Sequence, residues 1–257
     1  MTTRRPAPPP APEPEPEPGS ESGSGSVPAA PHPLLAYFLD AADGCFPPAD
    51  GAVTVLPALP TPPGALEASV AFTGHAVLAT ALAAPKIHAL RPDGFGGSMG
   101  PDFLRALAGP TGWIGSVDAV LVRRGFGGAA RLQPLSGADG HPRVRYARRL
   151  RAGVRVFGDE RGLVTLAAGL AGRTELSIEL HTPDHGGRSG HGRSLLGDAL
   201  TLVQAGEPVF AAVAPGNARS MRAFLAAGFT PVGAEVIVRP DRAPAQRRRG
   251  GHESPPP

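Results

Sequence analysis

The chain of 257 residues has little cysteine, lysine or aromatic residue content. Cys45 is its only cysteine, so no disulfide can form within the chain, and we expect an intracellular, cytoplasmic location. A lone cysteine beside Phe46 and Pro47 is typical of a buried apolar position rather than of a nucleophile. No apolar run is long enough to span a bilayer, and residues 1–30 lack the pattern of a signal peptide, so we expect no membrane partner.

Aromatic residues make up 5% of the chain, too few for the exposed stacking surface of many nucleic-acid-binding domains. The formal net charge is only +3, although the pI is about 9.7. Lys86 is the only lysine, and the abundance of Ala, Gly, Pro and Arg is typical of a G+C-rich genome. We therefore do not expect a nucleic-acid partner. The hydrophobic fraction of 41% is enough for a folded core.

Composition divides the chain into four stretches. Residues 1–33 are a Pro/Glu/Ser/Gly tail and residues 240–257 a basic, proline-containing tail, and both are expected to be disordered because neither can bury apolar area. Residues 34–114 are expected to form an N-terminal α+β region without an assignable role. Residues 115–239 are expected to form a second α/β region.

Hydrophobic periodicity, with Gly and Pro as boundaries, predicts the elements of both regions. The first should contain a helix over 34–42 with Leu35, Phe38 and Leu39 on one face, one or two strands over 66–82 with a bend at Gly74, and a helix over 101–107. The second should contain strands at 117–122, 154–157, 163–170, 175–180, 209–213 and 232–238, and helices at 142–152, 194–204 and 218–227. This alternation indicates α/β architecture with a mixed sheet.

The most informative stretch is the glycine-rich turn that follows the strand at 175–180 and opens a helix. Such a turn gathers main-chain N–H groups at a helix N-terminus, where they can hold a phosphate. Glycine lets a ligand approach the backbone closely, and nearby arginine adds positive charge. We therefore expect a phosphorylated cofactor to bind at Arg188, Ser189, Gly190, His191, Gly192, Arg193 and Ser194.

Residues 117–238 resemble the GCN5-related N-acetyltransferase (GNAT) family in two motifs and in the order of elements. The first motif is the cofactor turn Arg/Gln-x-x-Gly-x-Gly/Ala with a leucine-rich helix after it, which is matched by Gly190, Gly192, Leu195 and Leu196. Gly187 stands at the leading Arg/Gln position, with Arg188 one place later. The second motif is an Asn before a helix that ends in Gly-Phe, which is matched by Asn217, Ser220, Gly228, Phe229 and Gly233.

The resemblance implies a mixed, mostly antiparallel GNAT-like sheet with flanking helices and acetyl-CoA as co-substrate. The strands at 175–180 and 209–213 are expected to diverge, so that pantetheine pairs with the main chain of Leu180 and Thr182. Asn217, Ser220 and Phe224 are also expected at the cofactor. The implied activity is N-acetyl transfer from acyl-CoA to an amine acceptor of a small molecule or a protein, and a homodimer is compatible with the sequence.

Amine acetylation requires a neutral amine, so a general base is needed. Glu179 stands where many members of this family carry a carboxylate base, although an ordinary polar strand position is an equal alternative. His181 is the second candidate because of its intrinsic pKa. The family often uses a tyrosine to protonate the leaving thiolate, and Phe224 occupies that position here. Ser220, water or another group must then donate the proton, or the protein is a GNAT-like acyl-CoA sensor or interaction module without catalysis.

Three other interpretations of the glycine-rich stretch remain open. It can be a plain flexible loop. It has the spacing of a P-loop from Gly187 to Ser194, but Arg193 replaces the lysine that normally reaches the terminal phosphates. Finally, the histidines at 181, 185 and 191, with Asp184, suggest a metal site, but Pro183 interrupts the spacing and no cysteine joins it, so we expect no metal.

Overall fold

The computed structural model describes residues 30–60, 66–181 and 190–242 of the chain, and those from Pro31 onward belong to one compact unit. The α-helices of these ranges are α1 Leu34–Ala42, α2 Ala84–Ala89, α3 Pro101–Ala108, α4 Pro142–Leu150, α5 His191–Ala199 and α6 Ala218–Ala226. The strands are β1 Val53–Leu56, β2 Glu67–Phe72, β3 His75–Ala79, β4 Trp113–Ile114, β5 Asp118–Arg124, β6 Gln133–Pro134, β7 Ala152–Asp159, β8 Gly162–Ala168, β9 Thr174–Leu180, β10 Pro208–Val213 and β11 Thr230–Arg239. Within the described ranges, none of the helices combines the length and the apolarity that a bilayer crossing requires.

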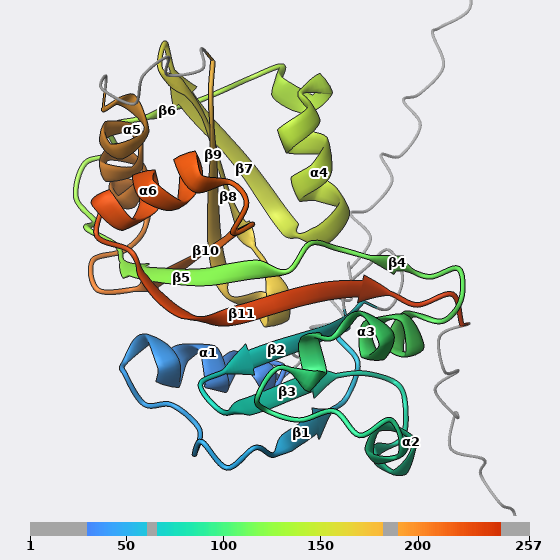
Figure 1. The fold of residues 1–257 in the computed structure, drawn as a ribbon. Coiled ribbons are helices and arrows are strands. Elements are labelled where there is room, and N and C mark those ends of the chain that lie inside the picture. The colour runs from blue at the N-terminus through green and yellow to red at the C-terminus, as the bar shows by residue number, and fades with distance from the viewer. Residues whose placement is uncertain (1–29, 61–65, 182–189, 243–257) are drawn as a thin grey trace, which may run out of the picture. The chain divides into compact units, whose positions relative to one another are not determined.

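The strands form one sheet in the order β1-β3-β2-β11-β5-β10-β9-β8-β7-β6, with β4 paired to β11 (Figure 1). The β1–β3 and β10–β9 pairs are parallel, and the other strand pairs are antiparallel. This confirms the α/β class with a mixed, mostly antiparallel sheet and flanking helices. It also joins residues 67–79 to the later strands, because β2 pairs with β11 from Glu67↔Val238 to Ala71↔Ala234.

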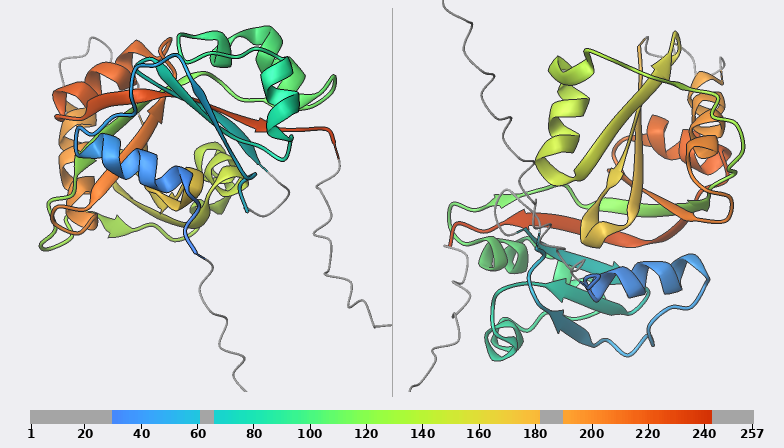
Figure 2. Two further views of the ribbon diagram at one scale, coloured as in Figure 1. Left: turned by 90° about the horizontal axis from the view of Figure 1, so that it is seen from below. Right: turned by 180° about the vertical axis from the view of Figure 1, so that it is seen from behind.

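Helices cover both faces of this sheet, and alternation along each strand supplies both cores. On β5, Val120 and Val122 pack in the cluster that holds Phe38 of α1, whereas Leu121 packs with Leu195 of α5. The front and back views agree that α4 and α5 lie on opposite sides of β8 and β9 (Figures 1 and 2). A third cluster joins α3 to β3 and β11. Each face of β9 therefore looks into a different layer of helices.

The predicted elements recur with shifted boundaries and some omissions. Residues 66–82 contain two strands, β2 and β3, which turn at Gly74 with a φ of +72°. The helix predicted from residue 194 begins at His191 instead, because Gly190 adopts a left-handed conformation that suits the start of the helix, and a 3-10 turn over Leu200–Leu202 follows α5. The short elements β1, α2, β4 and β6 were not predicted, since two to six residues carry little periodicity.

Two burial predictions in the N-terminal region are wrong. The buried face of α1 is Leu34, Phe38 and Ala41, whereas Leu39 remains 38% exposed. The i, i+4, i+7 spacing of the buried residues is the helical stripe that faces the sheet, and Leu39 lies beside it. Cys45 is exposed rather than buried, because it lies in the loop after α1, where its N–H donates to the carbonyl of Asp40.

Candidate functional site

Strands β9 and β10 pair at one end and then separate. Their parallel ladder has one register pair, Phe210↔Glu175, although β9 continues to Leu180. By contrast, β9 pairs with β8 at seven positions, and β10 pairs with β5 at six. Figure 1 shows β9 running away from the direction of β10. This is the divergence that the family resemblance led us to expect, and in the described residues it leaves one edge of β9 without a strand partner beyond Glu175.

A cavity of about 710 Å³ lies beside this divergence. Its walls come from β9, from α4, from the first turn of α5 and from the length of α6. The lining residues are Arg143, Ile178, Glu179, Leu180, Gly190, Gly192, Arg193, Asn217, Arg219, Ser220, Arg222, Ala223 and Ala226. We call it the first cavity. Its volume falls within the range of small-molecule and cofactor sites, roughly 300–1,000 Å³.

The first cavity is strongly positive in character. Both α5 and α6 present their N-termini to it, and neither carries an acidic residue in its first turn. Arg193 and Arg219 stand in those first turns, where a cation opposes the helix dipole and is normally disfavoured. In the described ranges, no carboxylate pairs with Arg193, Arg219 or Arg222. Such an arrangement suits an anionic ligand, which would balance both the dipoles and the side chains.

Two glycines shape the α5 side of this cavity. Gly190 precedes the helix with a φ of +66°, a backbone conformation that side chains other than glycine rarely adopt. Gly192 is buried, and a Cβ there would lie 3.3 Å from the Cβ of Ala223 on α6. The glycine motif therefore lets α5 begin at the cavity and pack closely against α6.

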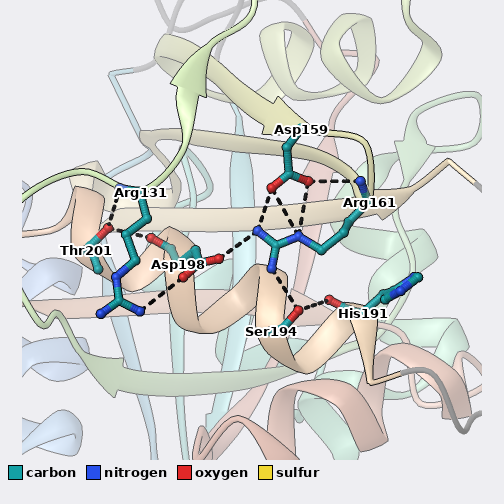
Figure 3. Close-up of polar contacts among 7 residues, drawn as sticks. All are labelled: Arg131, Asp159, Arg161, His191, Ser194, Asp198 and Thr201. Carbon is teal, nitrogen blue, oxygen red and sulfur yellow. Dashed lines mark hydrogen bonds and ion pairs between the residues drawn. The ribbon is translucent and has the colours of Figure 1, made fainter.

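A charge cluster around Arg161 holds α5 in place (Figure 3). Arg161 lies in the β7–β8 turn, and its guanidinium donates to Asp159, to Ser194 Oγ at 2.8 Å and to Asp198 at 2.6 Å. Asp159 raises the pKa of Arg161 and is the largest cause of that shift, and burial opposes it. The Ser194 hydroxyl also donates to the carbonyl of His191. Ser194 therefore positions the first turn of α5 from outside the first cavity, which does not support the magnesium role that a P-loop serine would have.

A second cavity of about 320 Å³ adjoins the first and shares Arg143, Ile178, Asn217 and Ser220 with it. It lies on the α4 side of β9 and reaches β5, β10 and β11. Its other lining residues are Ser116, Asp118, Tyr146, Leu150, Arg151, Leu170, Glu175, Ser177, Ala212, Val213, Ala214, Phe224, Glu235 and Ile237. Carboxylates, a phenol and apolar side chains thus surround a compact space.

A buried ion network forms one wall of the second cavity. Arg173 is fully buried and donates to both carboxylate oxygens of Glu235, at 2.7 and 2.8 Å, and to Glu175 at 3.1 Å. Arg151 forms a second ion pair with Glu175. Burial alone would lower the pKa of Arg173, but Glu235 and Glu175 outweigh it and raise that pKa. Burial raises the pKa of Glu235 despite Arg173, whereas Arg151 and Arg173 overcome burial and lower the pKa of Glu175.

The two catalytic candidates lie in different surroundings. Glu179 lines the first cavity, where Arg143 Nε donates to its carboxylate at 3.1 Å and His141 lies 3.9 Å away. The guanidinium of Arg143 therefore already occupies the carboxylate of Glu179. His181 is exposed at the end of β9, where its N–H donates to the carbonyl of Arg161. His181 lines neither cavity.

The structure brings several of the predicted cofactor residues to the first cavity, namely Leu180, Gly190, Gly192, Arg193, Asn217 and Ser220. Asn217 accepts the N–H of Ser220 at 3.2 Å and so caps α6. Phe224 is 3% exposed, packs edge-on against Phe229 and lines the second cavity. His191 is exposed and lines neither cavity. Thr182, Arg188 and Ser189 lie outside the described residues, as do Asp184 and His185.

Several cavity residues were missed by the sequence analysis, notably Asp118, Tyr146 and Glu235. Tyr146 could have been singled out from the sequence, because it is one of two tyrosines in the chain and lies in an arginine-rich helix. Burial is the largest cause that raises its pKa. No local sequence pattern indicated Asp118 or Glu235, because their positions depend on strand pairing across more than a hundred residues.

Comparisons with known proteins add no assignment. No family model matches this chain, and no curated protein matches it. A solved structure of a functionally unknown conserved protein from Staphylococcus epidermidis ATCC 12228 resembles 54% of the chain at 12% sequence identity, with a TM-score of 0.35. The match spans 66% of that protein's length, just under two thirds, and likeness at this level carries no argument.

Proposed function

We propose that the protein is an acyl-CoA-dependent N-acyltransferase, most simply one that moves an acetyl group from acetyl-CoA to an amine. The observation that carries this proposal is the first cavity, where two helix N-termini meet arginines that have no carboxylate partner among the described residues, beside the edge of β9 that has separated from β10. A diphosphate would balance the two helix dipoles and the charges of these arginines. The resemblance of the glycine turn and of the Asn217 helix to the GNAT family supports the same ligand.

In this proposal the cofactor and the acceptor approach from different cavities. The diphosphate lies at the first turn of α5, and the pantetheine arm follows the unpaired edge of β9 past Leu180. The thioester then reaches the residues that both cavities share, with Asn217 and Ser220 on one side and Ile178 on the other. The amine enters from the second cavity and attacks directly, so no covalent enzyme intermediate is required.

Protonation of the leaving thiolate needs a donor other than the side chain at position 224. Phe224 packs against Phe229 and has no proton to give. Tyr146 is the tyrosine that lines the second cavity, and its raised pKa keeps the phenol protonated near neutral pH. We assign the donor role to Tyr146 or to the proton of the attacking amine. If neither serves, the protein binds acyl-CoA as a sensor or interaction module, and the buried phenylalanine is the observation that favours this second function.

Calorimetry on the full chain tests the proposal. Acetyl-CoA and CoA should bind with measurable heat, and a concentration of 100 times the Kd should raise the free energy of unfolding by about 2.7 kcal/mol. Thiol release with a panel of primary amines then measures transfer. Binding with no amine-dependent thiol release would favour the sensor. Absence of binding by both CoA species at millimolar concentration would overturn both functions.

A further inference from the structure

The second cavity contains a carboxylate, Asp118, that forms no ion pair among the described residues. Resting on the proposed function, we propose that Asp118 receives the ammonium group of the acceptor in this cavity and takes its proton, and that the acceptor is a compact primary amine with an apolar body.

Strand pairing sets Asp118 directly opposite Glu235, the register partner on β11. Two like charges in such a position destabilise a sheet. Arg173 neutralises Glu235 through two hydrogen bonds, and Arg151 and Arg173 neutralise Glu175. In residues 66–181 and 190–242, no arginine, lysine or histidine forms an ion pair with Asp118. A cationic ligand group is the partner that this arrangement lacks.

In these ranges, the side chain of Asp118 has one hydrogen bond, which Ser116 Oγ donates at 2.8 Å. Burial raises the pKa of Asp118, and the charge of Glu175 adds to that shift, whereas Ser116, Arg151 and Arg173 oppose it. A carboxylate with a raised pKa accepts a proton from an amine more readily than an ordinary aspartate does. Glu179 differs from Asp118 in its partners, because Arg143 forms an ion pair with it.

The proton transfer balances without a further reactant. Asp118 takes one proton from the ammonium ion, which leaves a neutral amine and a carboxylic acid. The nitrogen lone pair attacks the thioester carbon, and the carbon–sulfur bond breaks. The proton that the nitrogen then loses in forming the amide neutralises the departing CoA thiolate, and Asp118 returns its own proton to solvent.

Size and lining limit the body of the acceptor. About 320 Å³ is near the lower limit for small-molecule sites. Leu150, Leu170, Val213, Phe224 and Ile237 supply apolar surface. Arg143 and Arg151 make a second ammonium group on the acceptor unfavourable. A monoamine with a short alkyl or aryl body fits these features better than a diamine does.

The test compares Asp118→Asn with wild type in transfer to isoamylamine and 2-phenylethylamine. The kcat/KM for the amine should fall at least 100-fold, and the acidic limb of its pH profile should disappear. The Kd of acetyl-CoA should stay within threefold, which also shows that the variant is folded. Asp102→Asn on α3 removes the same charge outside both cavities and should behave as wild type.

Two further variants sharpen the test. Ser116→Ala removes the hydrogen bond that lowers the pKa of Asp118, so the acidic limb should move to higher pH. Glu179→Gln decides which of the two carboxylates is the base. The proposal requires kcat/KM to fall less in Glu179→Gln than in Asp118→Asn. A wild-type protein that fails to bind acetyl-CoA would overturn the proposed function itself. Transfer that survives in Asp118→Asn, or that is faster on putrescine or a lysine-containing peptide, would overturn the present proposal alone.

Discussion

The first and second cavities adjoin, yet their charges are arranged in opposite ways. The first has arginines without carboxylate partners in the described residues, namely Arg193, Arg219 and Arg222. The second has Asp118 as a carboxylate without a cationic partner there, although every other carboxylate on its wall is paired. One space therefore suits an anion and the other a cation, and the separation of β9 from β10 connects them. Two oppositely charged reactants would be held side by side by such a pair of cavities.

The comparison also distinguishes charged side chains that pair with one another inside the fold from charged side chains that are available to a ligand. Arg173, Glu175 and Glu235 are buried and form ion pairs with one another inside the fold. Arg193 is exposed and Asp118 is half-buried, and neither forms an ion pair within the part of the chain that the structure describes. Unpaired charge in a cavity costs stability unless something binds there. Three predictions test this division, from the largest expected effect to the smallest.

Substitution of the buried Arg173 should have the largest effect on the free energy of unfolding. Arg173→Met removes the cation between Glu235 and Glu175 and its contacts over Phe38 and Phe210, at 4.3 and 5.3 Å. Glu235 is then buried and unpaired, so the free energy of unfolding should fall by about 3–5 kcal/mol. Urea unfolding at neutral pH measures this change.

The matched control is Arg145→Met on the exposed face of α4, which should change stability by less than about 0.5 kcal/mol. Arg173→Met combined with Glu235→Gln removes both members of the pair and should recover part of the loss. If the double variant is no more stable than the single one, the network does not balance the charge of Glu235 as we describe.

A charge reversal in the first cavity should affect binding rather than folding. Arg193→Glu should weaken acetyl-CoA binding about tenfold, or ~1.4 kcal/mol, because it places a carboxylate beside the diphosphate. Stability should stay equal or rise slightly, since an acid in the first turn of α5 favours the helix dipole. Arg145→Glu makes the same change in net charge outside both cavities, and calorimetry compares the two. Equal weakening in both variants would mean that net charge, and not the site, attracts the cofactor.

The local sequence pattern predicted most of the helices and strands of residues 115–239. It also predicted part of the candidate site. Gly190, Gly192 and Asn217 could be placed because turns and helix caps depend on neighbouring residues in the chain. The divergence of β9 from β10 followed from the family resemblance. The roles of individual side chains were harder to predict. Glu179 has the right alternation for a base, but Arg143 of α4, 36 residues away, donates a hydrogen bond to its carboxylate.

What could not be predicted depends on distant pairing. Asp118 and Glu235 come together because β5 lies beside β11, and nothing within a short window of sequence specifies that neighbour. Residues 34–114 did not indicate that β2 would extend the same sheet. Burial of Leu34 rather than Leu39 in α1 was likewise decided by the face that the sheet covers. Tertiary contacts therefore determined the second cavity, whereas local contacts determined much of the first.

The smallest expected effect concerns the stability cost of Asp118 itself. Its pKa is raised in the folded protein, chiefly by burial, so the folded state holds this proton more tightly than the unfolded chain does. Below the ordinary pKa of 3.8 the group is protonated in both states and costs nothing. As the pH rises through the raised pKa, the folded protein loses stability relative to a variant without the charge.

Asp118→Asn should therefore match wild type in urea unfolding at low pH and become the more stable protein at pH 7. An excess of a bound monoamine should reduce that difference, because its ammonium group supplies the missing partner. A variant that is less stable than wild type at neutral pH would show that Asp118 serves the fold, and the contrast between the two cavities would then fail.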